Sequence, residues 1–308
     1  MPKVASKIES TTLSGSDLLT IDNHYLAGMP QLAYVGLSEN WLLKECGHRH
    51  WMALAISNGK IDPEFHDDQG HKSYAAFTAV SVHSATLDHI SENQRFSIST
   101  QLSRPSRARF CSSHQVIASD KNCVSVDMVS TFVFRRELGN NQSVTRASFA
   151  AIDSVVDEVL PEHAVKLMQL SKQFRTDDWQ NHFGFKRNDK KVLQEAAFKP
   201  CPNHDFNGAN FLYFASFQAF VDRAEWQWFN FKEIPQLKDR DLFYYRNINV
   251  GDSLTVRLCA LMTNEESITH WCEVVRENGT KIADIFTHKR FKGASTNIDC
   301  LGETKRES

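Results

Sequence analysis

The chain has 308 residues and a formal net charge of −2, and 41% of its residues are hydrophobic. This length accommodates two domains of common size, and the balanced charge argues against nucleic acid and anionic membranes as partners. No apolar run approaches the roughly 20 residues that a membrane helix needs, and residues 1–20 lack the apolar core of a signal peptide. The seven cysteines are scattered without a Cys-x-x-Cys pair, so we expect reduced thiols and a cytoplasmic protein.

The first half of the chain has the pattern of one helix followed by antiparallel strands. Residues 1–23 are polar and are expected to form a flexible leader. An edge strand is predicted from His24 to Leu32, ended by Pro30, and a helix over 37–56. Strand patterns follow at 73–83, 95–103, 107–118 and 123–136, which together predict an α+β unit over residues 24–140.

The second half repeats this order of elements. Residues 141–200 are predicted to connect the halves, with a helix over 161–173 and an exposed loop over 177–191. A second unit, 201–293, is predicted to begin with a buried helix over 208–228, whose polar stripe is only Gln218, Asp222 and Glu225. Strands are expected at 241–250, 253–263, 267–277 and 281–292, followed by a flexible tail over 294–308.

The two predicted helices share one plan, with a glycine turn, small polar residues at the start, an apolar run and a closing tryptophan. Tyr74 follows Gly36 by 38 positions, and Tyr244 and Tyr245 follow Gly208 by 36 and 37. Each half therefore places a tyrosine on the first strand after its helix. This pattern predicts a tandem duplication in which functional sites lie where the halves meet.

Several stretches within residues 24–292 resemble a known family: Gly28–Leu32, Gly36–Glu45, His50-Trp51 and Phe206–Phe214. They are similar to the double hot dog acyltransferase/decarboxylases of polyketide biosynthesis, represented in the leinamycin pathway. The resemblance implies two tandem hot dog units, each with a long central helix wrapped by an antiparallel sheet. It further implies an enzyme that loads methylmalonyl from CoA onto a tyrosine, decarboxylates it and transfers propionyl to an acyl carrier protein. Such enzymes use no metal and no organic cofactor.

The order of elements in that family points to Tyr74 as the nucleophile. A phenol has a reference pKa near 10, so a reactive tyrosine oxygen needs groups that stabilise its ionised form. An aromatic side chain that fills the face of the sheet is the alternative interpretation.

Decarboxylation also requires donors that point at the thioester oxygen, where an enolate develops. The starts of the two predicted helices offer free N–H groups and a partial positive charge. Asn40, Asn207 and Asn210 lie at these starts and can donate from their side chains, or they serve only as helix caps.

Two carboxylates, Glu39 and Asp205, lie nearest the helix starts. In a hot dog thioesterase or dehydratase acting on CoA-bound or carrier-bound acyl chains, one of them is the expected base, with His50 or His24 as a partner. Stabilisation of the helix dipole is the alternative. A non-catalytic module that binds acyl carriers is a third hypothesis.

No metal site is predicted, because Cys46, His48 and His50 have no second ligand cluster with matching spacing. An acidic carrier protein is expected to bind a basic patch in a salt-dependent manner. The sequence leaves the oligomeric state open. The candidate cations for the phosphates of CoA or phosphopantetheine are Arg104, Arg107, Arg109, Lys186-Arg187 and Lys190-Lys191.

Overall fold

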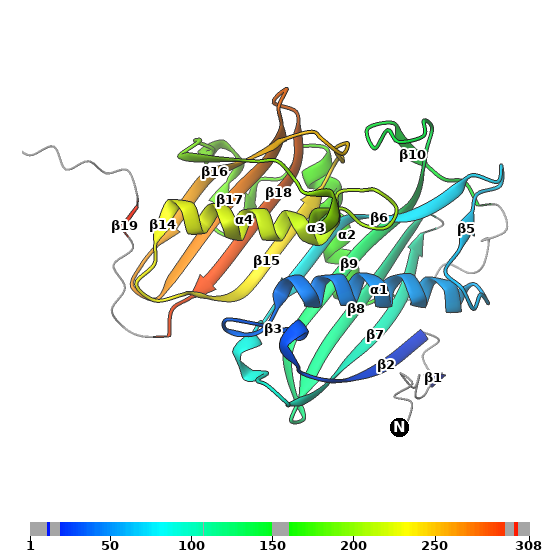
Figure 1. Ribbon diagram of the computed structural model, residues 1–308, viewed down its shortest axis with the longest axis horizontal. Coiled ribbons are helices and arrows are strands. Elements are labelled where there is room, and N and C mark those ends of the chain that lie inside the picture. Colours follow the sequence, from blue (N-terminus) through cyan, green and yellow to red (C-terminus); the bar gives the residue numbers. More distant parts are fainter. Residues whose placement is uncertain (1–10, 13–18, 107, 150–159, 293–298, 301–308) are drawn as a thin grey trace, which may run out of the picture.

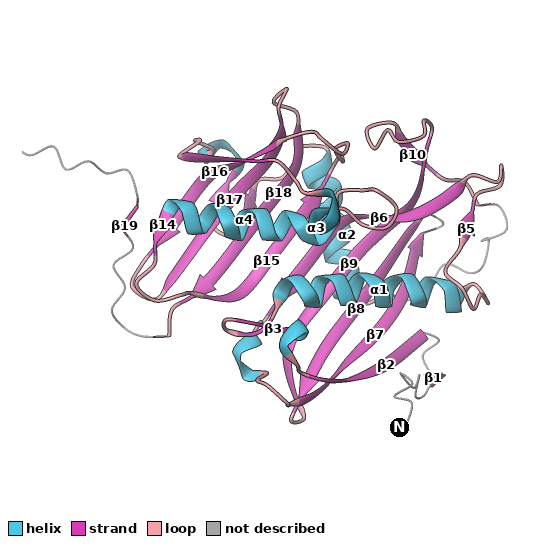
Figure 2. Cartoon of the chain, in the orientation of Figure 1, coloured by secondary structure: helices cyan, strands magenta, loops and turns pink. Residues whose placement is uncertain are grey.

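A single antiparallel sheet of thirteen strands runs through the described part of the chain (Figures 1 and 2). The computed structural model describes residues 11–12, 19–106, 108–149, 160–292 and 299–300. The long strands of the first half are β2 (Leu19–Leu26), β6 (Lys72–His83), β7 (Arg95–Ser106), β8 (Arg109–Ala118) and β9 (Lys121–Arg135). Those of the second half are β13 (Gln194–Phe198), β15 (Gln236–Tyr244), β16 (Leu254–Thr263), β17 (Ser267–Arg276) and β18 (Lys281–Arg290).

Four α-helices and several short elements complete the fold of the described residues. The helices are α1 (Glu39–Ser57), α2 (Glu162–Arg175), α3 (Pro202–Asp205) and α4 (Phe214–Trp228). The short strands are β1 (Thr11–Thr12), β3 (Leu32–Ala33), β4 (Gly36–Leu37), β5 (Phe65–His66), β10 (Val144–Arg146), β11 (Asn181–His182), β12 (Phe185–Lys186), β14 (Phe229–Asn230) and β19 (Asp299–Cys300). Single 3-10 turns cover Met29–Gln31, Leu87–His89 and Arg187–Asp189.

The strand order is mirrored about the middle of the sheet. The first half reads β2-β7-β8-β9-β6 and the second β15-β18-β17-β16-β13. In chain order, β2, α1 and β6 to β9 thus correspond to β13, α4 and β15 to β18, as the predicted duplication requires. The edge strand β13 of the second repeat lies inside the segment 141–200 that the sequence predicted to be a connection.

The two halves join through a short seam between β6 and β15. It comprises four residue pairs, from Arg240 opposite Val82 to Phe243 opposite Ala79. Beyond Ala79, residues 74–78 of β6 pair with β9 on one side, but with no described strand on the other. The sheet therefore has an open edge at one end of the seam.

Helices α1 and α4 lie on the same face of the sheet, and α2 crosses the opposite face (Figure 1). Ser38 caps the start of α1, where its Oγ accepts a hydrogen bond from the backbone N–H of Trp41 at 3.3 Å. Where α1 meets α4, Gly47 lies against the ring of Phe214, and a Cβ at position 47 would stand only 2.7 Å from that ring. The two helices thus approach closely at a residue without a side chain.

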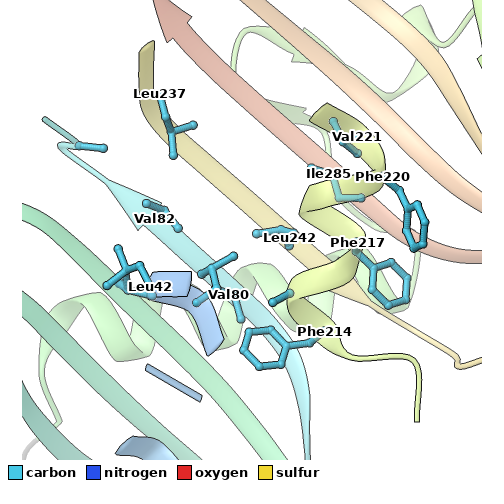
Figure 3. Close-up of a cluster of buried hydrophobic side chains, with 14 of the residues drawn as sticks. Leu42, Val80, Val82, Phe214, Phe217, Phe220, Val221, Leu237, Leu242 and Ile285 are labelled. Carbon is cyan, nitrogen blue, oxygen red and sulfur yellow. The ribbon is translucent and has the colours of Figure 1, made fainter. Parts of the chain in front are cut away.

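Apolar side chains of both halves form one continuous core beneath these helices. Phe214, Phe217, Phe220 and Val221 of α4 belong to one buried cluster with the sheet residues Val80, Leu242 and Ile285 (Figure 3). Leu42 of α1 and Val82 of β6 belong to the same cluster. Because strands from both repeats contribute to this core, the halves are held together by burial of apolar surface as well as by the seam.

A second apolar cluster lies around α2. The ring of Phe174 in α2 stacks on Phe243 of β15 with centroids 3.9 Å apart, and Trp179 packs against Phe174 at 4.8 Å. Trp179 is only 2% exposed and Phe185 only 4%. The prediction of an exposed loop over 177–191 therefore holds for most of these residues but not for Trp179 and Phe185, which are buried beside α2 although their sequence neighbours are polar.

The start of the second helix differs from the prediction. Helix α4 begins at Phe214 rather than at 208, because Asn207 Oδ1 accepts hydrogen bonds from the backbone N–H groups of Ala209 and Phe211 at 3.0 and 3.1 Å. These bonds hold a turn in which Asn210 has φ +61°. Strand β15 also lies earlier than predicted, at 236–244 instead of 241–250.

The predicted leader and tail fall mostly outside the described residues. Residues 19–23, assigned to the leader, belong to β2, and Asp299–Cys300 of the predicted tail pair with β14. No helix in the described ranges is both long and apolar enough to cross a membrane.

Candidate functional site

Two cavities flank the seam, one at each end. The Glu39 cavity has a volume of about 490 Å³ and is lined by the start of α1, the polar stripe of α4 and the first residues of β15. The Tyr74 cavity, about 420 Å³, lies at the open edge of β6 and is lined by the loop before α4, the end of β15 and the end of α2. Each cavity therefore adjoins the start of one central helix.

Glu39 is the first residue of α1 and faces the Glu39 cavity, although it is only 9% exposed. Its Oε2 lies 3.2 Å from Nη1 of Arg240 on β15, a side chain with no exposed surface. Its Oε1 is buried without a hydrogen-bond partner among the described residues. A buried carboxylate oxygen with no partner is costly and is characteristic of functional sites rather than of helix capping.

The polar stripe of α4 supplies two further carboxylates to the same network. Asp222 Oδ1 lies 2.7 Å from Arg240 Nη2 and 3.0 Å from Lys289 Nζ. Glu225 contacts Lys289, and its Oε1 lies within hydrogen-bond distance of His270 Nε2, at 2.8 Å. Together with Glu39, this places three carboxylates around two permanent cations, so the charges do not balance unless a proton is added.

Of the three carboxylates, Glu39 is the one that takes up the balancing proton most readily. Burial raises the pKa of Glu39 to about 7, and the nearby Arg240 only partly opposes this effect. Although burial acts against it, Arg240 and Lys289 hold the pKa of Asp222 well below its usual range. Lys289, together with His270, likewise lowers the pKa of Glu225. Glu39 is thus the carboxylate that exchanges a proton near neutral pH, as a general base or acid requires.

Asn40 lines the Glu39 cavity but is engaged with the second helix. Its Nδ2 donates to the backbone carbonyl of Ala215 at 3.1 Å and approaches Oε1 of Gln218 at 3.4 Å. Gln218 in turn donates to Asp222. The side chain of Asn40 therefore connects α1 to the polar stripe of α4.

Tyr74 and Asn207 line the other cavity together. The Tyr74 ring packs edge-on against Phe211 with centroids 5.6 Å apart, and the Arg135 guanidinium lies 5.8 Å from the Tyr74 ring. The Oδ1 of Asn207 is occupied by the turn before α4, so this side chain shapes the loop. Asn207 lies in that loop and not at a helix start, contrary to the prediction.

Asn210 and Asp205 are not among the residues that line either cavity. Asn210 is fixed through its backbone carbonyl, which accepts from Asn141 Nδ2 at 2.6 Å. Asp205 is 5% exposed, and its Oδ2 accepts from the backbone N–H of Cys201 at 2.7 Å. The carboxylate of Asp205 thus stabilises the short helix α3, because it binds the backbone at the start of that helix.

Comparison with known proteins gives a match in structure alone. No protein-family model and no curated protein sequence matches the chain. An acyl-ACP thioesterase from Bacteroides thetaiotaomicron superimposes with a TM-score of 0.57 over 88% of this chain and 97% of that one, at 12% identity. A 12:0-ACP thioesterase from Umbellularia californica gives 0.56 over 89% and 94%, at 9% identity. The chain has a double hot dog fold.

In this double hot dog, the two histidines predicted to assist a carboxylate, His50 and His24, do not contact Glu39 or Asp205. His50 is buried between Ser112 and Ser130, with both ring nitrogens 2.7 Å from a serine Oγ, and burial lowers its pKa to about 3. His24 lies on the edge strand β2 and lines neither cavity. Within the described residues, no three His, Cys, Asp or Glu side chains are arranged so that they could hold a metal ion.

The sequence missed the cations that complete the Glu39 network. Arg240 and Lys289 lie on β15 and β18, where strand patterning gives no sign that they point into a core. The available signal was the polar stripe of Gln218, Asp222 and Glu225 on a helix predicted to be buried. Buried carboxylates require cationic partners, so the stripe indicated that such partners exist without identifying them.

Proposed function

We propose that the chain hydrolyses acyl thioesters and that Glu39 is the general base. The observation that carries this proposal is the buried carboxylate of Glu39, with a pKa near 7 and an oxygen without a partner, facing a cavity of about 490 Å³. The similarity to acyl-ACP thioesterases shows the fold only, but it agrees with thioester chemistry at such a site. Acyl-CoA and acyl carrier protein are the donors that we propose, in a cytoplasmic setting.

In the proposed reaction, the ionised Glu39 carboxylate takes a proton from a water molecule. The water oxygen forms a bond to the thioester carbon, and the carbonyl oxygen becomes an oxyanion. As the carbon–sulfur bond breaks, the proton held by Glu39 returns to the departing thiolate. The products are a carboxylic acid and a free thiol, and the base is regenerated.

The first turn of α1 offers donors for the oxyanion. Ser38 Oγ already accepts from the N–H of Trp41, whereas the N–H groups of Glu39 and Asn40 have no partner among the described residues. A helix start also carries a partial positive charge, which favours the negative oxygen that develops during attack. The apolar wall of the cavity, formed by Leu87, Phe231 and Leu237, suits an acyl chain.

Glu39→Gln tests this proposal directly. Removal of a general base is expected to lower the rate of free-thiol release from acyl-CoA by about 10²- to 10⁴-fold. Tyr74→Phe is the matched comparison and is expected to retain the wild-type rate. Equal rates for the Glu39→Gln and wild-type proteins would refute the role of Glu39.

Two other outcomes would indicate a different function. The absence of thiol release from any acyl-CoA or acyl carrier would favour a binding module. Water loss from a 3-hydroxyacyl thioester without thiol release would indicate a dehydratase.

A second candidate function is acyl transfer with decarboxylation at Tyr74. The observation that favours it is the position of the tyrosine in the other cavity, beside the Arg135 guanidinium. In this reaction the phenol oxygen forms an ester with the methylmalonyl group as the carbon–sulfur bond breaks and CoA leaves as its thiol. CO₂ then departs and the resulting enolate takes up a proton. The propionyl group passes to the thiol of an acyl carrier protein, whose proton returns to the phenol oxygen. The intact mass of the protein after incubation with methylmalonyl-CoA should then increase in the wild type and not in Tyr74→Phe. No increase in either protein, together with no CO₂ release, would exclude this candidate.

A further inference from the structure

Five arginines from five different parts of the chain converge on the Tyr74 cavity. They come from β8, β10, the end of α2, the segment after β15 and the end of β17, and all five line the cavity. Two are half-buried and three are exposed. In this order they are Arg109, Arg146, Arg175, Arg246 and Arg276.

No aspartate or glutamate is among the described residues that line this cavity. Within the described residues, none of the five arginines forms an ion pair with a carboxylate. Arg175 donates to the backbone carbonyl of Tyr244 at 3.0 Å, and Arg276 to Gln142 Oε1 at 3.0 Å. These two guanidinium groups are thus held by neutral acceptors. Asp252, which does not line the cavity, acts on Arg276 from a distance without forming an ion pair with it.

The arginines are close enough to repel one another. Desolvation lowers the pKa of Arg175, and the charges of Arg109, Arg146 and Arg246 lower it further, although Tyr245 opposes them. Desolvation also lowers the pKa of Arg276, with a contribution from Arg246, although the Asp252 carboxylate opposes them. Like charges gathered in one cavity without an ion-paired carboxylate raise the free energy of the empty protein, and an anion that binds there relieves this repulsion.

The rest of the cavity wall offers neutral donors and aromatic rings. Residues 74–78 present the unpaired edge of β6, and Thr78, Thr131 and Thr145 line the wall together with the rings of Tyr74 and Phe211. Guanidinium groups bind phosphate oxygens in pairs, and aromatic rings stack on a nucleotide base. A single carboxylate would neutralise only one of the five charges.

We propose that the Tyr74 cavity binds the phosphate groups of a pantetheine thioester. The ligand class is a phosphate ester that carries several negative charges, either the nucleotide end of CoA or the phosphopantetheine arm of a carrier. The identity of the ligand rests on the proposed thioester chemistry, but binding at this cavity does not require turnover. The Glu39 cavity and the Tyr74 cavity then have separate tasks, chemistry at one and anion recognition at the other.

The test measures binding of CoA, ADP, 4′-phosphopantetheine and phosphate-free pantetheine by calorimetry to the full chain. Arg109→Gln with Arg246→Gln is the informative variant, because neither side chain has a described hydrogen bond to lose. We expect CoA to bind the wild type and to bind the double variant at least tenfold more weakly. Binding of CoA to the wild type should weaken at high salt. Arg257→Gln removes an arginine that is paired with Glu195 at 2.7 Å, and it should bind CoA as the wild type does.

The other ligands identify the source of the phosphate. Binding of ADP without phosphopantetheine supports the nucleotide of CoA, and the reverse supports a carrier arm. Pantetheine that binds as tightly as CoA, or CoA affinity unchanged in the double variant, would overturn the proposal. Glu39→Gln should retain wild-type CoA affinity, so failure of the anion site and failure of the proposed catalysis give different results.

Discussion

The guanidinium Nη1 of Arg240 lies 3.2 Å from Oε2 of Glu39, which connects a strand of the second hot dog unit to the first helical residue of the first unit. Arg240 has no exposed surface, and the same guanidinium contacts Asp222 at 2.7 Å. One cation thus holds carboxylates from both central helices. This arrangement stabilises the site and joins the two halves of the duplication.

Replacement of this cation should be strongly destabilising. Arg240→Met leaves Glu39, Asp222 and Glu225 with Lys289 as the remaining permanent cation, and we expect a loss of about 3–5 kcal/mol in the free energy of unfolding. Urea denaturation at pH 7 measures this loss. Arg257→Met, which breaks a partly exposed pair, should cost less than about 1 kcal/mol, and equal losses in the two variants would contradict the role of the buried network.

The raised pKa of Glu39 predicts how stability changes with pH. Its pKa is about 7 in the folded protein against a reference value of 4.5, so the folded state binds the proton more tightly than the unfolded state. The contribution of Glu39 to stability should therefore be complete below about pH 4.5 and decline by about 3 kcal/mol as the pH rises through 7. The difference in unfolding free energy between wild type and Glu39→Gln, measured from pH 4.5 to 8, isolates this contribution. A difference that is flat over this range would show that the carboxyl group is not perturbed.

The same pKa governs the expected rate of hydrolysis. A general base acts in its ionised form, so kcat/KM should fall about tenfold for each pH unit below about 7 and level off above it. The Glu39→Gln protein should lack this inflection in its residual rate. An inflection near pH 4 in the wild type would assign the base to a carboxylate with an ordinary pKa.

Close packing of the two central helices predicts a cost at Gly47. Alanine usually stabilises a helix interior relative to glycine, but a Cβ at position 47 would lie 2.7 Å from Cε1 of Phe214. Gly47→Ala should therefore lower the melting temperature, with a cost of about 1–3 kcal/mol from overpacking. Adding Phe214→Leu should recover part of this loss. A Gly47→Ala protein that is more stable than the wild type would show that the helices separate easily.

Asp205 should prove structural. Asp205→Ala removes the acceptor for the backbone N–H of Cys201, and we expect a loss of about 1–3 kcal/mol in stability. Because Asp205 lines neither cavity, the folded variant should hydrolyse acyl-CoA at a rate within a few-fold of the wild type. A 100-fold loss of rate in a folded Asp205→Asn protein would instead make Asp205 the base.

Local sequence signals predicted most of the elements but not all of their boundaries. Strands β6 to β9 and the helix over 37–56 were placed within a few residues, because alternation and helical periodicity mark them directly. The edge strand predicted over 24–32 was misplaced, since β2 covers 19–26 and Met29–Gln31 form a 3-10 turn. The start of α4 was misplaced, because Asn207 accepts hydrogen bonds from the backbone of the following turn and does not cap a helix. Residue propensities do not distinguish these two roles of asparagine. The buried Trp179 was missed because its neighbours in sequence are polar.

The sequence by itself determined two helices of one plan, each followed by strands, and hence a duplicated fold. It also placed Glu39 and Tyr74 beside the junction of the repeats. Only the tertiary structure decided that Glu39 meets Arg240, Asp222 and Lys289, and that five arginines share the cavity of Tyr74. The reason is physical: periodicity depends on neighbours along the chain, whereas the protonation of a buried carboxylate depends on charges that distant strands bring to it.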